Sequence, residues 1–210
     1  MGARFAGVTL VAAVSLFLAA WILMPGVGVT DPVQIFALVA SRRLLVAVSV
    51  VVQLVSATLY VPALIAMLTA AGTIRGTRAG AGLLIIGAMG SAADAVLHLL
   101  AYAMTMPDLD VRTLVRVMAF MQGPGLVLLA PLLVSFFAGG AVLSVAFARA
   151  GLVSRWNPRL HLVALAIAVI GSALASAGVL SARFVGLTTL ACFSAPQALI
   201  GVALCRRHAG

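Results

Sequence analysis

The chain has 210 residues, of which 64% are hydrophobic and 8% are charged. Soluble domains are roughly 45–50% apolar and about 25% charged, so the composition excludes an ordinary soluble fold. A membrane-spanning helix needs about 20 apolar residues, and the chain supplies roughly six such segments. The sequence therefore predicts an all-α, integral membrane bundle of six transmembrane helices that forms one domain over residues 1–210.

The formal net charge of +9 comes from arginines alone, since the sequence contains no lysine. These arginines stand singly or in pairs at the ends of apolar runs, which is typical of topology signals and not of a nucleic-acid surface. The lack of lysine excludes imine chemistry, and the lack of glutamate excludes the HExxH metalloprotease helix. Cys192 and Cys205 form no CxxC motif. We expect no cofactor, no metal site, no catalytic residues and no nucleic-acid partner.

Six apolar runs follow one another along the chain. The predicted spans cover residues 5–24, 44–71, 80–106, 126–148, 160–181 and 184–204. An amphipathic segment at residues 112–122 is expected to lie at the outer headgroup level. We predict a helix break within residues 122–125, because Pro124 lacks a backbone donor and two glycines flank it. The last two spans are expected to meet at a tight turn of Ala182 and Arg183.

Arginines in the short connections predict the orientation. With the N-terminus inside, eight lie on the inner side: Arg4, Arg75, Arg78, Arg149, Arg155, Arg159, Arg206 and Arg207. Five lie on the outer side: Arg42, Arg43, Arg112, Arg116 and Arg183. Both termini are therefore predicted to be cytoplasmic in a bacterial plasma membrane, with the loop of Asp108 and Asp110 outside.

Two polar stripes interrupt the second and third spans. Asp94 and His98 are the ionisable residues that fall deep inside a span, and their spacing of four places them on one helix face. That face carries Ser91, Asp94, His98, Tyr102 and Thr105, and the second span carries a matching face of Ser49, Gln53, Ser56 and Tyr60.

The two spans form an antiparallel hairpin around a turn near residues 75 and 76. Residues equally far from this turn lie at equal depth, which brings four polar pairs level: Gln53 with His98, Ser56 with Asp94, Tyr60 with Ser91, and Ser49 with Tyr102. A charged residue in mid-bilayer costs about 2.5–3.5 kcal/mol on insertion scales, so facing polar partners are expected. We predict that Asp94 and His98 face the second span, with Gln53 and Ser56 at their level.

The polar side chains that face each other between the second and third spans form what we call the polar seam. This polar seam has three interpretations. It joins two helices by hydrogen bonds, or it forms a binding pocket or proton relay, or His98 ligates a metal or haem. Shared haem ligation with His161 is disfavoured, because at 1.5 Å per residue the two histidines lie roughly 25 Å apart in depth.

Several local patterns carry a resemblance to a known family. They are the long second span, which reads Arg42-Arg43-Leu44-Leu45 into Leu59-Tyr60-Val61-Pro62, and the loop from Arg149 to Trp156. With six spans, this layout resembles the bacterial membrane family labelled domain of unknown function 4386. The resemblance implies the six-helix fold and no activity.

Three functions follow from the sequence. The first is a bundle that binds a small apolar molecule, a lipid or a membrane partner subunit through the polar seam. The second is a proton-coupled transporter or permease that uses Asp94 and His98. The third is a membrane redox or metal-binding subunit. The third is disfavoured because such chemistry needs more convergent groups than one carboxylate and one imidazole.

Overall fold

The computed structural model describes residues 2–106 and 110–206, and every regular element in that part is helical. Six helices are long and apolar enough to cross a membrane. They are α1 (Ala3–Leu23), α3 (Arg43–Ala71), α4 (Thr77–Met104), the helix Val111–Arg149, α7 (Arg159–Ser176) and α8 (Ala182–Arg206). The predicted all-α bundle with six membrane-spanning helices is confirmed.

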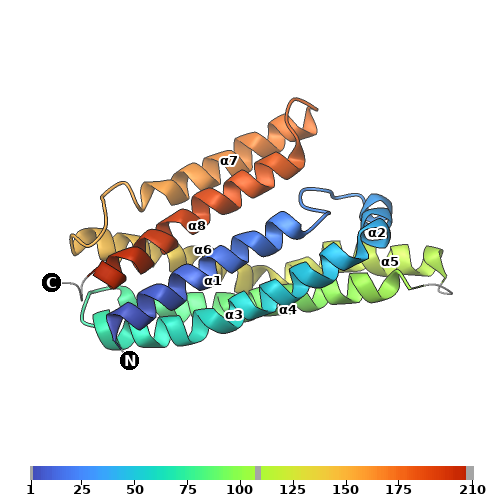
Figure 1. The fold of residues 1–210 in the computed structure, drawn as a ribbon. Coiled ribbons are helices and arrows are strands. Elements are labelled where there is room, and N and C mark those ends of the chain that lie inside the picture. Colours follow the sequence, from blue (N-terminus) through green and yellow to red (C-terminus); the bar gives the residue numbers. More distant parts are fainter. Residues whose placement is uncertain (1, 107–109, 207–210) are drawn as a thin grey trace.

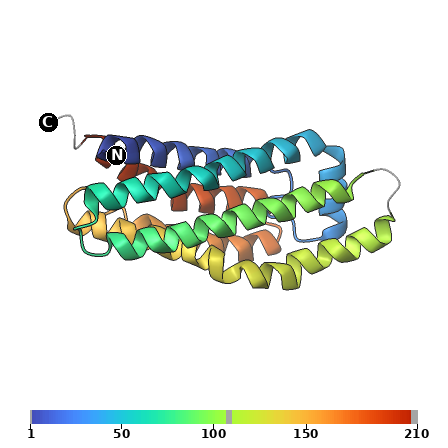
Figure 2. The ribbon, with the colours of Figure 1, turned by 90° about the horizontal axis from the view of Figure 1, so that it is seen from below.

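Five of the long helices form a ring, and the sixth lies outside it. Around the ring, α1 packs against α3, α3 against α4, α4 against α6 (Leu126–Arg149), and α8 closes the ring between α6 and α1. α7 packs mainly against α8, on the side away from α3 and α4 (Figure 1). α1 begins and α8 ends at the same end of the bundle, as Figure 2 shows.

The ring is packed tightly where α4 meets α6. A Cβ atom at Gly87 of α4 would lie 2.5 Å from the backbone nitrogen of Phe136, and one at Gly139 of α6 would lie 2.6 Å from that of Leu84. These two glycines allow the backbones to approach closely, as small residues do in membrane bundles. Next to this contact, aromatic side chains fill the centre of the ring of helices. They are Phe17, Tyr60, Phe136 and Phe193.

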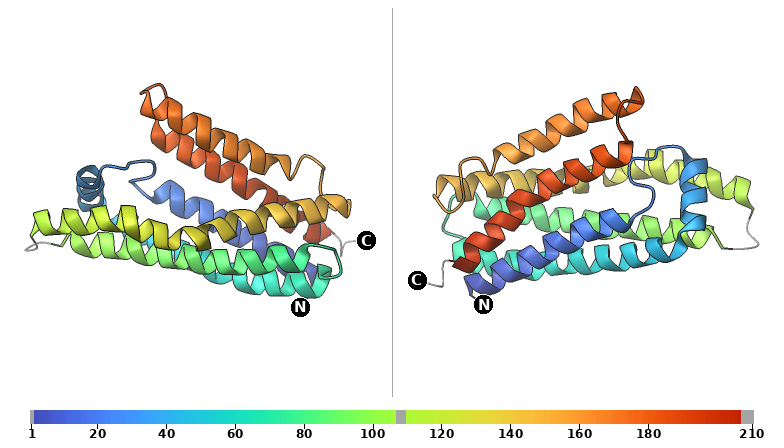
Figure 3. Two further views of the ribbon diagram at one scale, coloured as in Figure 1. Left: turned by 180° about the vertical axis from the view of Figure 1, so that it is seen from behind. Right: turned by 45° about the horizontal axis from the view of Figure 1, so that its top comes forward.

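A short helix that we did not predict lies between the first two spans. α2 (Pro32–Ser41) begins at Asp31, whose carboxylate accepts a hydrogen bond from the Val33 backbone N–H. Pro32 stands in the first turn, where its missing N–H has no effect on the helix. α2 crosses the end of the bundle opposite the termini, near α5 (Val111–Phe120) (Figure 3).

The α-helix is interrupted at the predicted residues 122–125, but the chain stays helical there. The chain continues from α5 through one π-helical turn, η1 (Met121–Gly125), directly into α6. The wider π-turn accommodates Pro124 without ending the helix, because a π-bulge shifts the hydrogen-bond pattern around the missing donor. Residues 112–122 are therefore the first part of one long helix, Val111–Arg149, whose α6 part packs against α4.

The connection between the last two helices also differs from the prediction. α7 ends at Ser176, and residues 177–181 form the connection before α8 begins at Ala182. Gly178 adopts a positive φ of 75°, a conformation that favours glycine and ends a helix. The predicted turn at Ala182 and Arg183 is therefore the first turn of α8.

Candidate functional site

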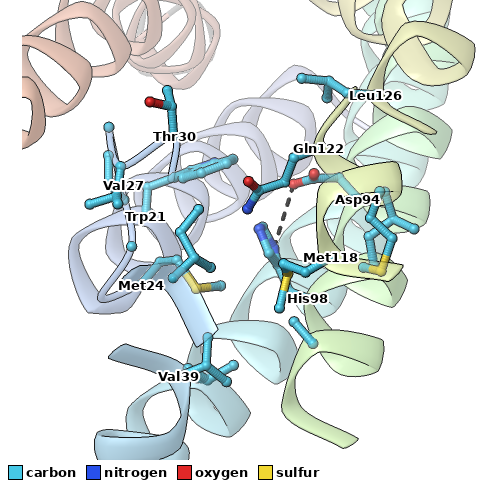
Figure 4. A pocket seen from close by; sticks show the side chains of 18 residues that line it. Trp21, Met24, Val27, Thr30, Val39, Asp94, His98, Met118, Gln122 and Leu126 are labelled. Carbon is cyan, nitrogen blue, oxygen red and sulfur yellow. Dashed lines mark ion pairs between the residues drawn. The ribbon is translucent and has the colours of Figure 1, made fainter. Parts of the chain in front are cut away.

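A cavity of about 320 Å³ lies in the half of the bundle opposite the chain ends. Helices α1 to α5, the connection after α1, and the π-turn with the start of α6 contribute to its wall. Most of the wall is apolar, with the polar side chains of Asp94, His98, Gln122 and Thr30 among Trp21, three methionines and aliphatic groups (Figure 4). The volume lies at the lower end of the range for small-molecule sites, roughly 300–1,000 Å³.

Asp94 and His98 stand on the inward face of α4, one helical turn apart. Asp94 is 8% exposed, and the side chain of His98 is 24% exposed. The His98 Nδ1 atom lies 3.7 Å from the Asp94 Oδ2 atom, beyond hydrogen-bond distance. The two side chains therefore lie close together without a hydrogen bond between them.

Gln53 of α3 joins both residues from the opposite helix. Its Nε2 atom donates to Asp94 Oδ2 at 2.9 Å and to the backbone carbonyl of Ser91 at 3.2 Å. Its Oε1 atom lies 3.4 Å from His98 Nδ1. Gln53 is 2% exposed, so these bonds are shielded from solvent. The predicted placement of Asp94 and His98 toward the second span, level with Gln53, is confirmed.

This arrangement fixes which atom of each group carries hydrogen. Because Gln53 Nε2 faces two acceptors, it must be the amide NH₂. Gln53 Oε1 then needs an N–H at His98 Nδ1, so the neutral imidazole carries its lone pair on Nε2. Neither His98 Nε2 nor Asp94 Oδ1 makes a hydrogen bond to residues 2–106 or 110–206. Both residues line the cavity.

Gln122 and Trp21 contribute further polar groups to the wall. Gln122 lies on the π-turn, and its buried Oε1 has no hydrogen-bond partner in the described part of the chain. The Trp21 Nε1 atom is likewise buried without a partner, and its indole ring stands edge to face with the His98 ring at 5.7 Å. Figure 4 shows the Trp21, Gln122 and His98 side chains around one space.

The other predicted polar pairs across the hairpin are not formed. Ser49 and Ser56 donate to the α1 carbonyls of Ala20 and Ala13, both at 2.7 Å. Tyr60 donates to Gln197 of α8 at 2.9 Å. Equal depth places two residues level but does not fix the direction in which each points, and α3 has α1 as well as α4 for a neighbour.

Ser91 and Tyr102 do not pair with the α3 side chains predicted for them, Tyr60 and Ser49. The Ser91 hydroxyl has no hydrogen-bond partner among the described residues, although its backbone carbonyl accepts from Gln53. The Tyr102 ring packs under the Arg43 guanidinium at 4.7 Å. Of the eight residues predicted to pair across the hairpin, the structure therefore brings together the side chains of Asp94, His98 and Gln53.

Four residues of the wall were not predicted as site residues: Trp21, Met24, Met118 and Gln122. Met118 and Gln122 are spaced by four on the amphipathic segment, which predicts a shared face but not what that face borders. Trp21 and Met24 lie at the end of the first span, where no pattern distinguishes a cavity wall from a lipid contact.

A second cavity of about 550 Å³ lies between the end of α1, α7 and α8. Trp21, Val27, Gly28 and Thr30 belong to the walls of both cavities. The second wall carries serine and threonine hydroxyls but no ionisable side chain. Within the described residues, no cluster of three or more His, Cys, Asp or Glu side chains is placed to hold a metal ion.

The chain matches no protein-family model, no curated protein and no solved structure. The resemblance to the domain of unknown function 4386 thus stays a prediction.

Proposed function

We propose that this protein is a membrane bundle that binds a small, mainly apolar molecule in the cavity beside Asp94 and His98. One observation carries the proposal: Asp94 and His98 line a mainly apolar space inside the bundle, and each has one polar atom without a hydrogen-bond partner among the described residues. Buried polar groups are normally paired, and one that faces a cavity offers a ligand a specific contact. The Gln53 bonds would hold these groups in place before a ligand arrives.

Filling the cavity tests the proposal. Ala101 of α4 lines the cavity, so Ala101→Phe should occupy part of its volume and abolish saturable binding of small aromatic probes. Val96→Phe is the matched control, since Val96 lies on the same helix and is 49% exposed on its outer face. Equal binding by the two variants in lipid nanodiscs would contradict the proposal.

Trp21 offers a reporter for this measurement. The chain has two tryptophans, and the other, Trp156, is 67% exposed near the opposite end of the bundle. In a Trp156→Phe background, a brominated probe in the cavity should quench Trp21 fluorescence in a saturable way. Quenching by probe dissolved in lipid should rise linearly with concentration and persist in the Ala101→Phe variant.

Proton-coupled transport is a second candidate, favoured by the ionisable pair of Asp94 and His98. A transporter needs a path from its binding site to both faces of the membrane. Between the cavity and the end of the bundle where α1 begins, the centre of the ring of helices is filled by the aromatic side chains of Phe17, Phe136 and Phe193. Binding is therefore the better-supported proposal. Proton-driven uptake of a bound probe by proteoliposomes, abolished by collapsing the pH gradient, would favour transport.

The membrane and the orientation are also proposals. We infer from the Arg distribution that both chain ends lie in the cytoplasm of a bacterium and that the cavity lies in the outer half of the membrane. The thiol of an Arg112→Cys variant should react with an impermeant reagent on intact cells. Labelling only after permeabilisation would reverse the orientation.

A further inference from the structure

Among the described residues, the polar atoms of the cavity wall without a hydrogen-bond partner include the Trp21 Nε1–H donor and three acceptor atoms, in Asp94, His98 and Gln122, and one of these acceptors belongs to a carboxylate. From this we infer that the ligand of the cavity is a lipophilic amine, a small organic cation with an apolar body. The inference rests on the binding function proposed above and adds the chemical class of the ligand.

Asp94 carries the charge argument. Its Oδ2 accepts from Gln53, its Oδ1 makes no hydrogen bond to the described residues, and Asp94 lines the cavity. The chain has 13 basic residues, yet none of the residues that line the cavity is an arginine. A carboxylate in an apolar site is costly unless a positive group pairs with it; with His98 neutral, a ligand ammonium would supply that group.

His98 and Gln122 add further acceptors at the same place. Since Gln53 Oε1 takes the Nδ1–H group of His98, the neutral ring presents the lone pair of Nε2. The oxygen of the Gln122 carboxamide has no hydrogen-bond partner in the described part of the chain. An ammonium carries up to three N–H donors and would satisfy several of these acceptors at once.

The apolar part of the wall favours a cation with an apolar body. Trp21 has the ring that attracts cations most strongly, and Met24, Met118 and Met121 bring polarisable thioethers. The aliphatic groups around them favour an apolar remainder. The volume of about 320 Å³ limits the ligand to one aromatic ring with a short chain or a body of similar size.

Matched probes that share one body test the charge class. We would titrate 4-(4-bromophenyl)butylamine, the corresponding alcohol and the corresponding carboxylic acid against the Trp156→Phe protein in nanodiscs of neutral lipid. The amine should bind at least tenfold more tightly than the alcohol, and the acid should bind most weakly. Each titration is repeated on Ala101→Phe, so that partition into lipid is subtracted.

The carboxylate is then removed. Asp94→Asn should bring the ratio of amine to alcohol affinity close to one, whereas Asp110→Asn, which removes an exposed carboxylate at the same end, should keep the wild-type ratio. If the asparagine variant at position 94 does not fold, the ratio in the wild-type protein still decides the inference.

The outcomes separate the inference from the proposed function. Saturable binding of the alcohol or the acid, as tight as that of the amine and lost in Ala101→Phe, keeps the binding function and overturns the amine assignment. No saturable quenching by any of the three probes overturns both.

Discussion

Two groups of buried polar residues in this bundle differ in what surrounds them. In the half away from the chain ends, Asp94, His98 and Gln53 border a cavity. Nearer the chain ends, Tyr60 and Gln197 bond to each other inside a closed aromatic core. A Cβ atom at Gly140 beside this second pair would lie 3.0 Å from Gln197 Nε2 and 3.2 Å from Phe193 Cζ. Burial of polar groups is common to both, so the adjacent space is what marks the first as a candidate site.

The largest loss of stability is expected from adding side-chain atoms at the tightly packed contact between α4 and α6. Gly87→Val would force side-chain atoms into the Phe136 backbone, which cannot move aside as a flexible side chain could. We expect a loss of about 3 kcal/mol or more in folding free energy, at the upper end of overpacking effects. Thermal unfolding of the purified protein in detergent measures the loss.

Gly82→Val is the control for that substitution. Gly82 lies on the same helix, and a Cβ atom there would meet nothing within 4 Å. Its stability should stay within about 0.5 kcal/mol of the wild type. Equal losses from the two variants would mean that α4 and α6 are not packed as described.

Tyr60→Phe probes the hydrogen bond in the closed core. The change leaves the Gln197 Oε1 acceptor buried without its donor, which costs about 1–3 kcal/mol. Tyr102→Phe is the matched control, because its ring keeps the packing with Arg43 and its hydroxyl makes no hydrogen bond to described residues. A Tyr60→Phe variant as stable as Tyr102→Phe would show that the Tyr60–Gln197 bond adds nothing.

A smaller effect is expected at the wall shared by the two cavities. The Arg183 guanidinium of α8 donates to the carbonyls of Ile22, Met24 and Pro25 and so holds the end of α1. Bonds to charged donors contribute up to about 3 kcal/mol when buried, but Arg183 is partly exposed, so Arg183→Met should cost about 1 kcal/mol. Faster proteolysis after α1, compared with Arg112→Met, is the measurement. Unchanged proteolysis would show that this wall is held by other contacts.

The sequence predicted much of the fold because membrane spans impose a strong length and polarity pattern. It also placed Asp94, His98 and Gln53 level, since depth in a helical hairpin follows from residue number. Rotation about the helix axis does not follow from residue number. Ser49, Ser56 and Tyr60 therefore found partners on α1 and α8 that the hairpin argument could not supply.

Two further differences from the predicted fold lie at α2 and at Pro124. The Asp31-Pro32 pair is a helix start signal, yet α2 has only 10 residues and is too short to stand out among spans. At Pro124 the sequence indicates a missing donor but not whether the chain ends the helix or widens one turn. The neighbouring α4 backbone packs along α6, and that tertiary contact lies outside any local pattern.

The smallest effect concerns the start of α5, whose later residues form part of the cavity wall. Asp110 is the N-cap of α5: its carboxylate accepts from the Thr113 hydroxyl and from the backbone N–H groups of Thr113 and Arg112. These bonds, with that of the Thr113 hydroxyl the strongest, lower the pKa of Asp110 below its ordinary value of 3.8. The cap therefore contributes fully above pH 3.8, and its contribution is lost as the pH falls through the lowered pKa. Amide exchange over α5, corrected for the intrinsic pH dependence of exchange, should speed up in that range. Asp110→Asn keeps an acceptor that does not titrate, so its exchange should not change there; the same pH response in both proteins would show that Asp110 is not the group responsible.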